Sequence, residues 1–299
     1  MKLAFIGFGE AAQAMALGFR QEGSLDRLAA YDIRIDDPAQ APDLKAKAAK
    51  LDVFLAPTMA DAVAGAPVVL SMVQGSAAVK VGEAVAPVLS TGQIFIDLNS
   101  IGPDAKRRVA EAVQKGGSGD CVEGAIMDAV RPKNHKVPIL LAGPRAAEVA
   151  EMLNAVGMVS EAIGEKIGQA CSVKMIRSVM MKGVEALILE SMRAAEVAGV
   201  TERILDSVNI TFDGLDWRKL TSHYLKRTHE HGLRRVSEMK ESAATLRSLG
   251  MEPLMSVAIA ETIAAGHAQL AGTPYDAAAQ YPELLKVLAA RIGSSSGEE

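Results

Sequence analysis

The stretch KLAFIGFGEAA, residues 2–12, places a short apolar run directly before the pattern G-x-G-x-x-A. The run predicts a β-strand over 2–6, and the alanine-rich segment after it predicts a helix beginning at Glu10. Gly7 permits the tight turn between them, Gly9 lets the backbone approach a pyrophosphate, and the small Ala12 allows close packing. Amides at the start of the helix, at the positive end of its dipole, attract the anion. The stretch therefore predicts a dinucleotide-binding turn formed by Gly7, Gly9, Glu10, Ala11 and Ala12.

An acidic residue follows the next predicted strand, which covers residues 28–31 and ends at Asp32. A carboxylate at this place in a βαβ unit accepts hydrogen bonds from the adenosine ribose hydroxyls of NAD. Arg34 lies close enough in sequence to contact the 2′-phosphate of NADP instead. We therefore expect NAD or NADP as the cofactor, with NAD favoured and with Asp32 and Arg34 near the adenosine ribose.

The order of the predicted elements gives the fold class. Up to about residue 160, short β-branched runs alternate with longer alanine-rich segments, and the runs at 68–73 and 93–97 are continuously apolar. Such runs are typical of strands buried on both faces by helices. The alternation predicts an α/β Rossmann domain with a mostly parallel sheet, and the remainder of the chain has helical periodicity without a strand candidate. We predict a dinucleotide-binding domain over 1–164 and an all-α domain for substrate binding and dimerisation over 165–299.

The composition excludes several classes of protein. The net charge of −4 and a pI near 5.8 argue against nucleic acid as a partner, because phosphates require a basic face. No stretch approaches the ~18 continuous apolar residues of a membrane span, and the first apolar run meets glycine too early for a signal peptide. Cys121 and Cys171 lack metal-ligand spacing. We therefore expect a cytoplasmic protein with two buried free thiols and no metal site.

Polar residues gather where another predicted strand ends, in the segment DLNSIGP at residues 97–103. Polar side chains at the carboxyl end of a strand face the ligand crevice of an open parallel sheet. The alternative is that Ser100 caps the following helix, with Pro103 in its first turn. Capping accounts for Ser100 and Pro103 but not for three polar groups together.

A lysine follows two glycines in the segment GEKIGQACSVKMIRS at residues 164–178, where a long helix is predicted. One face of this helix carries Lys174, Ser178, Met181 and Glu185. A solvated face is the usual explanation for such a set. Gly164 and Gly168, however, favour a close approach of the helix start to another element, which suits a site.

A second face of the same helix is apolar and needs more cover than one short domain offers. We therefore expect a homodimer. The apolar face consists of Val173, Ile176, Met180, Val184 and Leu187.

The three motifs G-x-G-x-x-A, D-x-N-S-x-x-P and G-x-x-x-G-x-A-x-x-x-K, in this order, resemble the β-hydroxyacid dehydrogenase family, which includes 3-hydroxyisobutyrate and 6-phosphogluconate dehydrogenases. The resemblance extends to about residue 185, and the helical C-terminal region resembles a divergent, less characterised branch. It implies that Lys174 exchanges the proton of a substrate hydroxyl while hydride passes to the nicotinamide. Ser100, beside Asn99, would hydrogen-bond substrate or nicotinamide, and the Val73-Gln74 loop would lie near the nicotinamide. A lysine performs this role where burial and nearby cations lower its pKa, and Arg177 and Lys182 are candidates.

Three departures from the family pattern concern the substrate. The family's D-x-S-T serine is Asn99 here, and the asparagine expected four residues after the lysine is Ser178. The family's Ser-Gly-Gly loop, which binds a substrate carboxylate through backbone amides, aligns with Met127-Asp128-Ala129. Asp128 would repel a carboxylate unless Arg131 or Lys133 pairs with it. The usual 3-hydroxy acid is therefore not the substrate, or it is bound differently. The expected substrate contacts are Ser100, Met127, Asp128, Arg177 and Ser178.

Three functions fit these motifs. The first is an NAD(P)-dependent dehydrogenase or reductase for a small β-hydroxy compound, with Lys174, Ser100 and Asn99 as catalytic residues. The second is a lyase in which Lys174 deprotonates a β-hydroxyl for retro-aldol cleavage, releasing a small aldehyde such as formaldehyde, with NAD(P) outside the chemistry. The third is a non-catalytic dinucleotide-binding protein. Lys174 argues against the third function, and against imine reductases, which share the architecture and usually lack this lysine.

Overall fold

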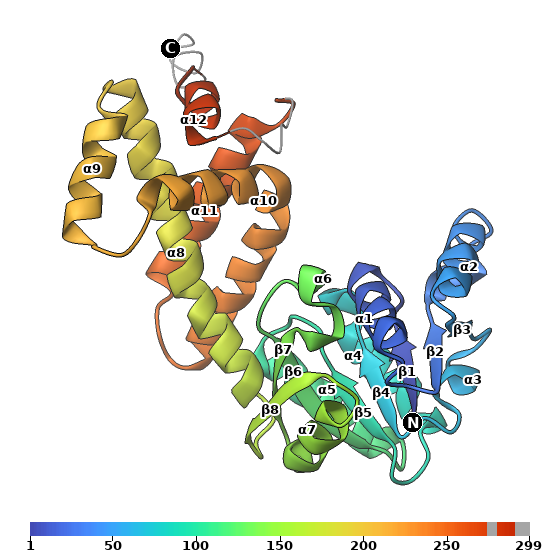
Figure 1. Ribbon diagram of the computed structural model, residues 1–299. Helices are drawn as coiled ribbons and strands as arrows, with labels where there is room; N and C mark the ends of the chain where they lie inside the picture. The colour runs from blue at the N-terminus through green and yellow to red at the C-terminus, as the bar shows by residue number, and fades with distance from the viewer. Residues whose placement is uncertain (274–279, 291–299) are drawn as a thin grey trace. The chain divides into compact units, whose positions relative to one another are not determined.

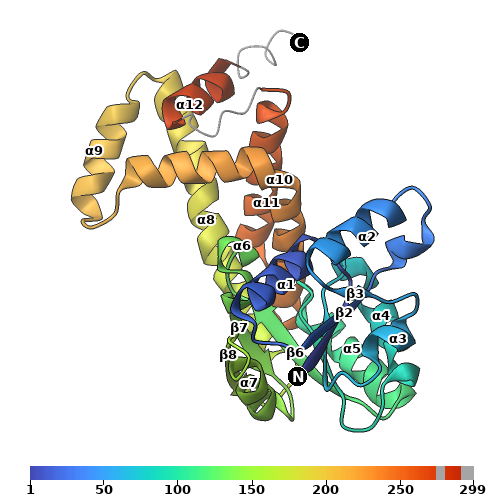
Figure 2. The same cartoon turned by 45° about the vertical axis from the view of Figure 1, so that its right-hand side comes forward.

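The computed structural model describes residues 1–273 and 280–290, which separate into two compact units. The first, the N-terminal unit, ends at Lys174, and the second, the helical unit, begins at Met175. Figures 1 and 2 show a sheet covered by helices in the first unit and helices alone in the second. The fold class expected from the sequence is confirmed.

The sheet has eight strands among the described residues, in the order β3-β2-β1-β4-β5-β6-β7-β8. All neighbouring pairs are parallel except β6–β7. The order reverses between β1 and β4, and ligands bind at such a switch point, outside the carboxyl ends of the strands. The strands are β1 (Lys2–Ile6), β2 (Arg27–Tyr31), β3 (Phe54–Leu55), β4 (Val68–Ser71), β5 (Ile94–Asp97), β6 (Asp120–Ile126), β7 (Pro138–Ala142) and β8 (Val159–Gly164).

Each face of the sheet has its own hydrophobic core. Leu3 and Phe5 of β1 point into one core, which contains residues of α1 (Glu10–Glu22), α2 (Ala41–Lys50) and α7 (Ala146–Asn154). Ala4 and Ile6 point into the other, with residues of α3 (Met59–Val63), α4 (Ala78–Val85) and α5 (Pro103–Gly116). This alternation explains why the central strands are continuously apolar, since both faces of each strand are covered. A short helix, α6 (Val130–Lys133), lies between β6 and β7.

The helix α8 (Gln169–Val197) begins in the N-terminal unit and continues into the helical unit. The helical unit also contains α9 (Thr201–Thr211), α10 (Trp217–Ser248), α11 (Leu254–Leu270) and α12 (Tyr281–Ala290), and its described residues include no strand. The turns between α9 and α10 and between α10 and α11 contain Gly214 and Gly250, both in the left-handed region, where a side chain is unfavourable. No helix within 1–273 or 280–290 combines the length and the apolar character that a membrane crossing needs.

Most of the residues predicted to form the apolar face of α8 are exposed among the described parts of the chain. Met180 and Leu187 are 71% and 64% exposed, and Val173 and Ile176 are also exposed. Val184 packs against a hydrophobic core of the helical unit. The homodimer expected from this face stays a prediction.

Candidate functional site

The glycine turn lies at the switch point of the sheet, between β1 and α1. Gly7 has φ of +90°, and a Cβ there would lie 2.4 Å from the carbonyl oxygen of Met72 and 2.8 Å from Cγ1 of Val73. The loops after β1 and β4 are therefore in direct contact. Gly9 is the N-cap of α1 with φ of −77°, and a Cβ there would meet no described atom within 4 Å. The helix start thus faces open space, which leaves room for a ligand at Gly9 but not at Gly7.

No side chain of the described residues caps the N-terminus of α1. The rest of the predicted turn follows Gly9 on this helix: the Glu10 side chain is exposed, Ala11 is half-buried and Ala12 is fully buried in the core. Uncapped amides at the positive end of a helix dipole favour an anion. The turn therefore has the geometry that a pyrophosphate requires.

Asp32 forms a bidentate contact with Arg34. The Arg34 guanidinium donates to Oδ1 at 2.9 Å and to Oδ2 at 2.8 Å, and the amide of Phe8 donates to Oδ2 at 2.8 Å. Burial raises the pKa of Asp32, but the hydrogen bonds from Arg34 and Phe8 lower it by more, so the carboxyl titrates below its usual range. Asp32 is therefore ionised at neutral pH and held beside the glycine turn.

Asn99 lies directly after β5 and is buried. Its Oδ1 accepts from the amide of Val73 at 2.7 Å, and its Nδ2 donates to Ser71 Oγ at 3.0 Å and to Asp97 Oδ1 at 2.6 Å. The side chain is thus committed to the protein and fixes the loop that continues to Gln74. Asn99 holds Val73 in place beside Gly7.

Ser100 is exposed at the same edge of the sheet. The alternative that Ser100 caps the next helix is wrong, because the residue at the N-cap of α5 is Gly102. Pro103 occupies the first turn as expected. A fixed proline φ and an extended glycine suffice to begin the helix there. The hydroxyl of Ser100 therefore has no capping role.

The start of α8 packs tightly, as its glycines suggest. Gly168 has φ of +108°, and a Cβ there would lie 2.9 Å from Nη1 of Arg107 and 3.4 Å from Cβ of Pro103. The amides of Gly168 and Ala170 both donate to Oε1 of Glu123, each at 2.8 Å. Lys174 follows Ala170 by one helical turn and is half-buried. The lysine thus projects from a helix start that is anchored on β6.

The polar face predicted for α8 is not one solvated surface. Glu185 is fully buried in the helical unit, where it forms an ion pair with Arg235 and accepts from Thr228 Oγ1 at 2.8 Å. Lys182 is also buried and lies 3.0 Å from a Glu238 carboxylate oxygen. Burial lowers the pKa of Lys182 more than Glu238 raises it. Because Glu238 compensates the charge of Lys182, Lys182 is a weaker candidate for lowering the pKa of Lys174 than the sequence alone suggests.

The remaining predicted substrate residues fall into two groups. Arg177 is exposed and Ser178 half-buried, both on α8 in the helical unit. Met127 and Asp128 follow β6 in the N-terminal unit. Oδ1 of Asp128 accepts from the amide of Ala129 at 2.8 Å, and its Oδ2 lies 2.7 Å from Lys133 Nζ. Of the two cations considered for Asp128, Lys133 is the one that pairs with it, whereas Arg131 lies 3.6 Å from Glu10.

The two thiols are not disulfide-bonded, and burial raises the pKa of both Cys121 and Cys171. Neither is therefore a ready nucleophile at neutral pH. No group of three or more potential metal ligands forms within the parts of the chain that the structure describes.

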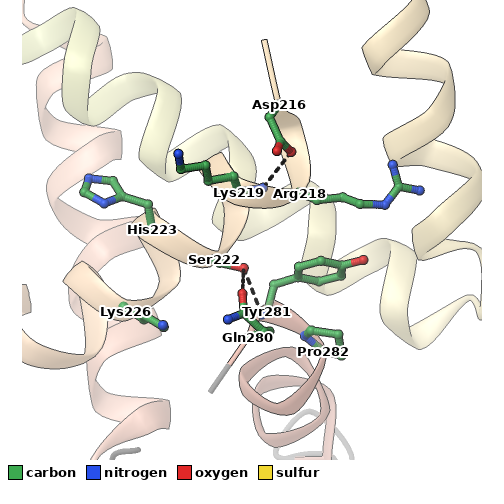
Figure 3. Close-up of a pocket in the computed structure, with 9 residues that line it drawn as sticks. All are labelled: Asp216, Arg218, Lys219, Ser222, His223, Lys226, Gln280, Tyr281 and Pro282. Atoms are coloured by element: carbon green, nitrogen blue, oxygen red, sulfur yellow. Dashed lines mark hydrogen bonds between the residues drawn. The ribbon is translucent and has the colours of Figure 1, made fainter. Parts of the chain in front are cut away.

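A cavity of about 720 Å³ lies in the helical unit and involves none of the predicted site residues. Figure 3 shows its wall, where Ser222 bonds to Gln280 and Tyr281. Arg218 pairs with Glu202 and Asp206, and the Asp216 carboxylate accepts from the amide of Lys219 as the N-cap of α10. The ion pairs of Arg218 join α10 to α9.

Two buried charged residues near the site, Lys106 and Glu123, are not among those predicted from the sequence. A signal for each is present. Lys106 lies on the buried face of α5 with Pro103 and Val109, and Glu123 interrupts the apolar run of β6. Because a charge in a buried position requires a partner, each of these residues predicts a buried group of opposite charge or a hydrogen-bonding group beside it.

A doubly wound sheet with a glycine turn at its switch point and an acidic residue after β2 defines a Rossmann-type dinucleotide-binding protein. Residues 2–164 match the family described as the NAD binding domain of 6-phosphogluconate dehydrogenase, which is more than half of the chain. The chain belongs to this family. Residues 195–265 match a domain of unknown function (DUF1932).

Several solved structures resemble this chain. A conserved hypothetical protein from Sinorhizobium meliloti 1021 is 54% identical, with a TM-score of 0.82 over 97% of this chain and 96% of that one. The conserved protein MTH1747, of unknown function and described as similar to 3-hydroxyacid dehydrogenases, is 28% identical, with a TM-score of 0.72 over 91% and 100%. The 3-hydroxyisobutyrate dehydrogenase of Mycobacterium tuberculosis is 16% identical, with a TM-score of 0.76 over 96% and 98%, and shares the fold.

Proposed function

We propose that this protein is an NAD(P)-dependent oxidoreductase that transfers hydride between the nicotinamide and a small β-hydroxy compound. The observation that carries the proposal is the arrangement of the N-terminal unit. The glycine turn and the Asn99-Ser100 segment follow the parallel strands β1 and β5, and the helix start before Lys174 is bonded to Glu123 of β6, the register partner of Asp97 at the end of β5. Carboxyl ends of parallel strands form the ligand edge in this class of fold.

The cofactor fits the glycine turn because a Cβ at Gly9 would occupy open space beside uncapped amides of α1. The nicotinamide, when bound, supplies the hydride acceptor or donor. Asn99 holds the Val73-Gln74 loop that would border the nicotinamide. Lys174 is the general acid or base that exchanges the hydroxyl proton, and Ser100 orients the reacting oxygen by a hydrogen bond.

The substrate does not bind to the loop after β6 through a carboxylate of its own. In the family that the sequence resembles, backbone amides of this loop bind the substrate carboxylate. Here the amide of Ala129 already donates to Asp128 Oδ1, and the Asp128 carboxylate would repel a second one. Lys133 pairs with Asp128 and reduces this repulsion without freeing the amide. Arg177 and Ser178 of α8 stay predicted substrate contacts.

The contact between Asp32 and Arg34 bears on the choice between NAD and NADP. We expect Arg34→Ala to raise the dissociation constant of NADPH about tenfold or more, because a 2′-phosphate would then face the unshielded Asp32 carboxylate. The dissociation constant of NADH is expected to change by less than about threefold. Fluorescence titration of the purified variant with each nucleotide measures both. Equal weakening for the two cofactors would remove Arg34 from the adenosine ribose site.

A turnover assay tests the proposed reaction. The purified chain is incubated with a panel of small β-hydroxy compounds and with NAD⁺ or NADP⁺, and the absorbance of the reduced nicotinamide is followed. Hydride transfer predicts one reduced nicotinamide per product formed. Because the occupied Ala129 amide departs from the family's carboxylate-binding loop, the lyase is kept as the second candidate. Retro-aldol cleavage of a β-hydroxy carbonyl compound needs deprotonation of the hydroxyl and no hydride transfer, since the substrate's carbonyl takes the electron pair of the broken C–C bond as an enolate. Aldehyde release without any change in absorbance would overturn hydride transfer and support the lyase.

A further inference from the structure

Three charged side chains form a buried cluster in the N-terminal unit. Asp97, Lys106 and Glu123 are each only 1% exposed. Asp97 of β5 and Glu123 of β6 are register partners on adjacent strands. Lys106 of α5 donates from Nζ to the carbonyl oxygen of Asp97 at 2.6 Å and to that of Gly124 at 3.2 Å, and Nζ lies 3.2 Å from Asp97 Oδ2. One ammonium therefore ties together the carboxyl-terminal halves of β5 and β6.

Glu123 extends this cluster to α8. A helix start is ordinarily capped by a side chain at its own N-cap position. Gly168, immediately before α8, has no side chain to offer, and the carboxylate that accepts from the amides of Gly168 and Ala170 comes from a strand instead. A carboxylate at this end of a helix is also favoured by the helix dipole. The first turn of α8 is thus fixed to β6 by a buried, long-range cap.

The other end of the cluster reaches the cofactor loop. Oδ1 of Asp97 accepts from the backbone amide of Asn99 at 3.0 Å and from its Nδ2 at 2.6 Å. Asn99 in turn accepts from the amide of Val73. Polar contacts therefore run from the loop after β4, through β5, Lys106 and β6, to the helix start. Lys174 lies four residues after Ala170, about 6 Å further along the helix axis.

We propose that Glu123 is a positioning residue for Lys174. Glu123 caps α8 from β6, the strand that Lys106 ties to β5, and it thereby fixes the position of Lys174 relative to the Asn99-Ser100 segment. This inference rests on the proposed function, since it requires Lys174 to act on the substrate. A misplacement of ~1 Å in such a site lowers turnover about 100-fold. Glu123 itself needs no contact with the substrate for this effect.

Two variants of Glu123 test the proposal, and a variant of an exposed carboxylate nearby serves as the control. Glu123→Ala removes the acceptor for both amides, whereas Glu123→Gln retains an oxygen in the same place and loses the charge. Glu165→Gln is the matched control, because Glu165 precedes α8 and is exposed. We expect kcat to fall about 100-fold in Glu123→Ala and only a few-fold in Glu123→Gln, with the dinucleotide Kd changed less than about twofold in both. Glu165→Gln is expected to behave like the unmodified chain.

Amide hydrogen exchange separates this inference from the proposed function. Residues 168–172 are expected to exchange faster in Glu123→Ala than in Glu123→Gln, with protection of the β1–β4 core unchanged. Unchanged exchange at 168–172 in Glu123→Ala overturns the inference, whether or not the chain turns over a hydroxy compound. Faster exchange with full kcat also overturns it, because the cap would then be structural only. If Lys174→Ala keeps its activity, the proposed function fails instead.

Discussion

Lys174→Ala is expected to lower turnover by about 10²–10⁴-fold, the contribution of a positioned general acid or base. The dinucleotide Kd is expected to stay within about twofold, because the glycine turn and Asp32 are formed by other elements. Steady-state kinetics with the substrate found in the turnover assay, together with nucleotide titration, measure the two effects. Small primary amines added to Lys174→Ala are expected to restore part of the rate, since they can occupy the space of the missing ammonium.

The control for this variant is Lys166→Ala. Lys166 precedes α8, as Glu165 does, and is exposed. Removal of a surface charge there changes stability by only about 0.5 kcal/mol or less. Full activity in Lys174→Ala would remove the lysine from both the dehydrogenase and the lyase mechanisms and leave a dinucleotide-binding protein. Loss of activity in both lysine variants would indicate that the helix start, rather than the Lys174 amine, is what matters.

The sequence predicts those parts of the fold in which local pattern and burial agree. β4 and β5 are apolar on both faces because helices cover both, so their pattern is visible without any knowledge of their partners. β3 has only two residues and β8 alternates exposed and half-buried positions, so neither gives a strong signal. The antiparallel pairing of β6 and β7 depends on the short connection through α6, which is too short for a parallel crossover.

The same distinction applies to the candidate site, where some residues could be identified from the sequence and their contacts could not. Gly7, Asp32, Asn99 and Lys174 could be identified because each belongs to a motif with its own spacing. Their partners could not, because those contacts join segments far apart in the sequence: Asn99 with Val73, and Glu123 with the amides of Gly168 and Ala170. Arg34 illustrates the limit. The sequence predicts only that Arg34 is close enough to contact a 2′-phosphate, whereas its guanidinium contacts with Asp32 depend on side-chain geometry.

The two glycines of the first turn are expected to respond differently to the same substitution. Gly7→Ala is expected to destabilise the fold by about 2–4 kcal/mol, because a Cβ would lie 2.4 Å from a backbone oxygen and φ is +90°. Gly9→Ala is expected to change the free energy of unfolding by less than about 0.5 kcal/mol, since its φ of −77° is ordinary and the space is open. Urea denaturation of both variants measures this difference.

Dinucleotide binding supplies the second measurement. Although Gly9→Ala folds normally, its methyl group would fill the space where a pyrophosphate approaches α1, so the Kd for NAD(P)H is expected to rise at least about tenfold. Gly23→Ala is the control for positive φ alone, because Gly23 has φ of +62° and a Cβ there meets no described atom within 4 Å. It is expected to cost about 1 kcal/mol and to leave binding intact. Unaltered binding in Gly9→Ala would place the cofactor away from this turn, even though Gly7 remains essential for the fold.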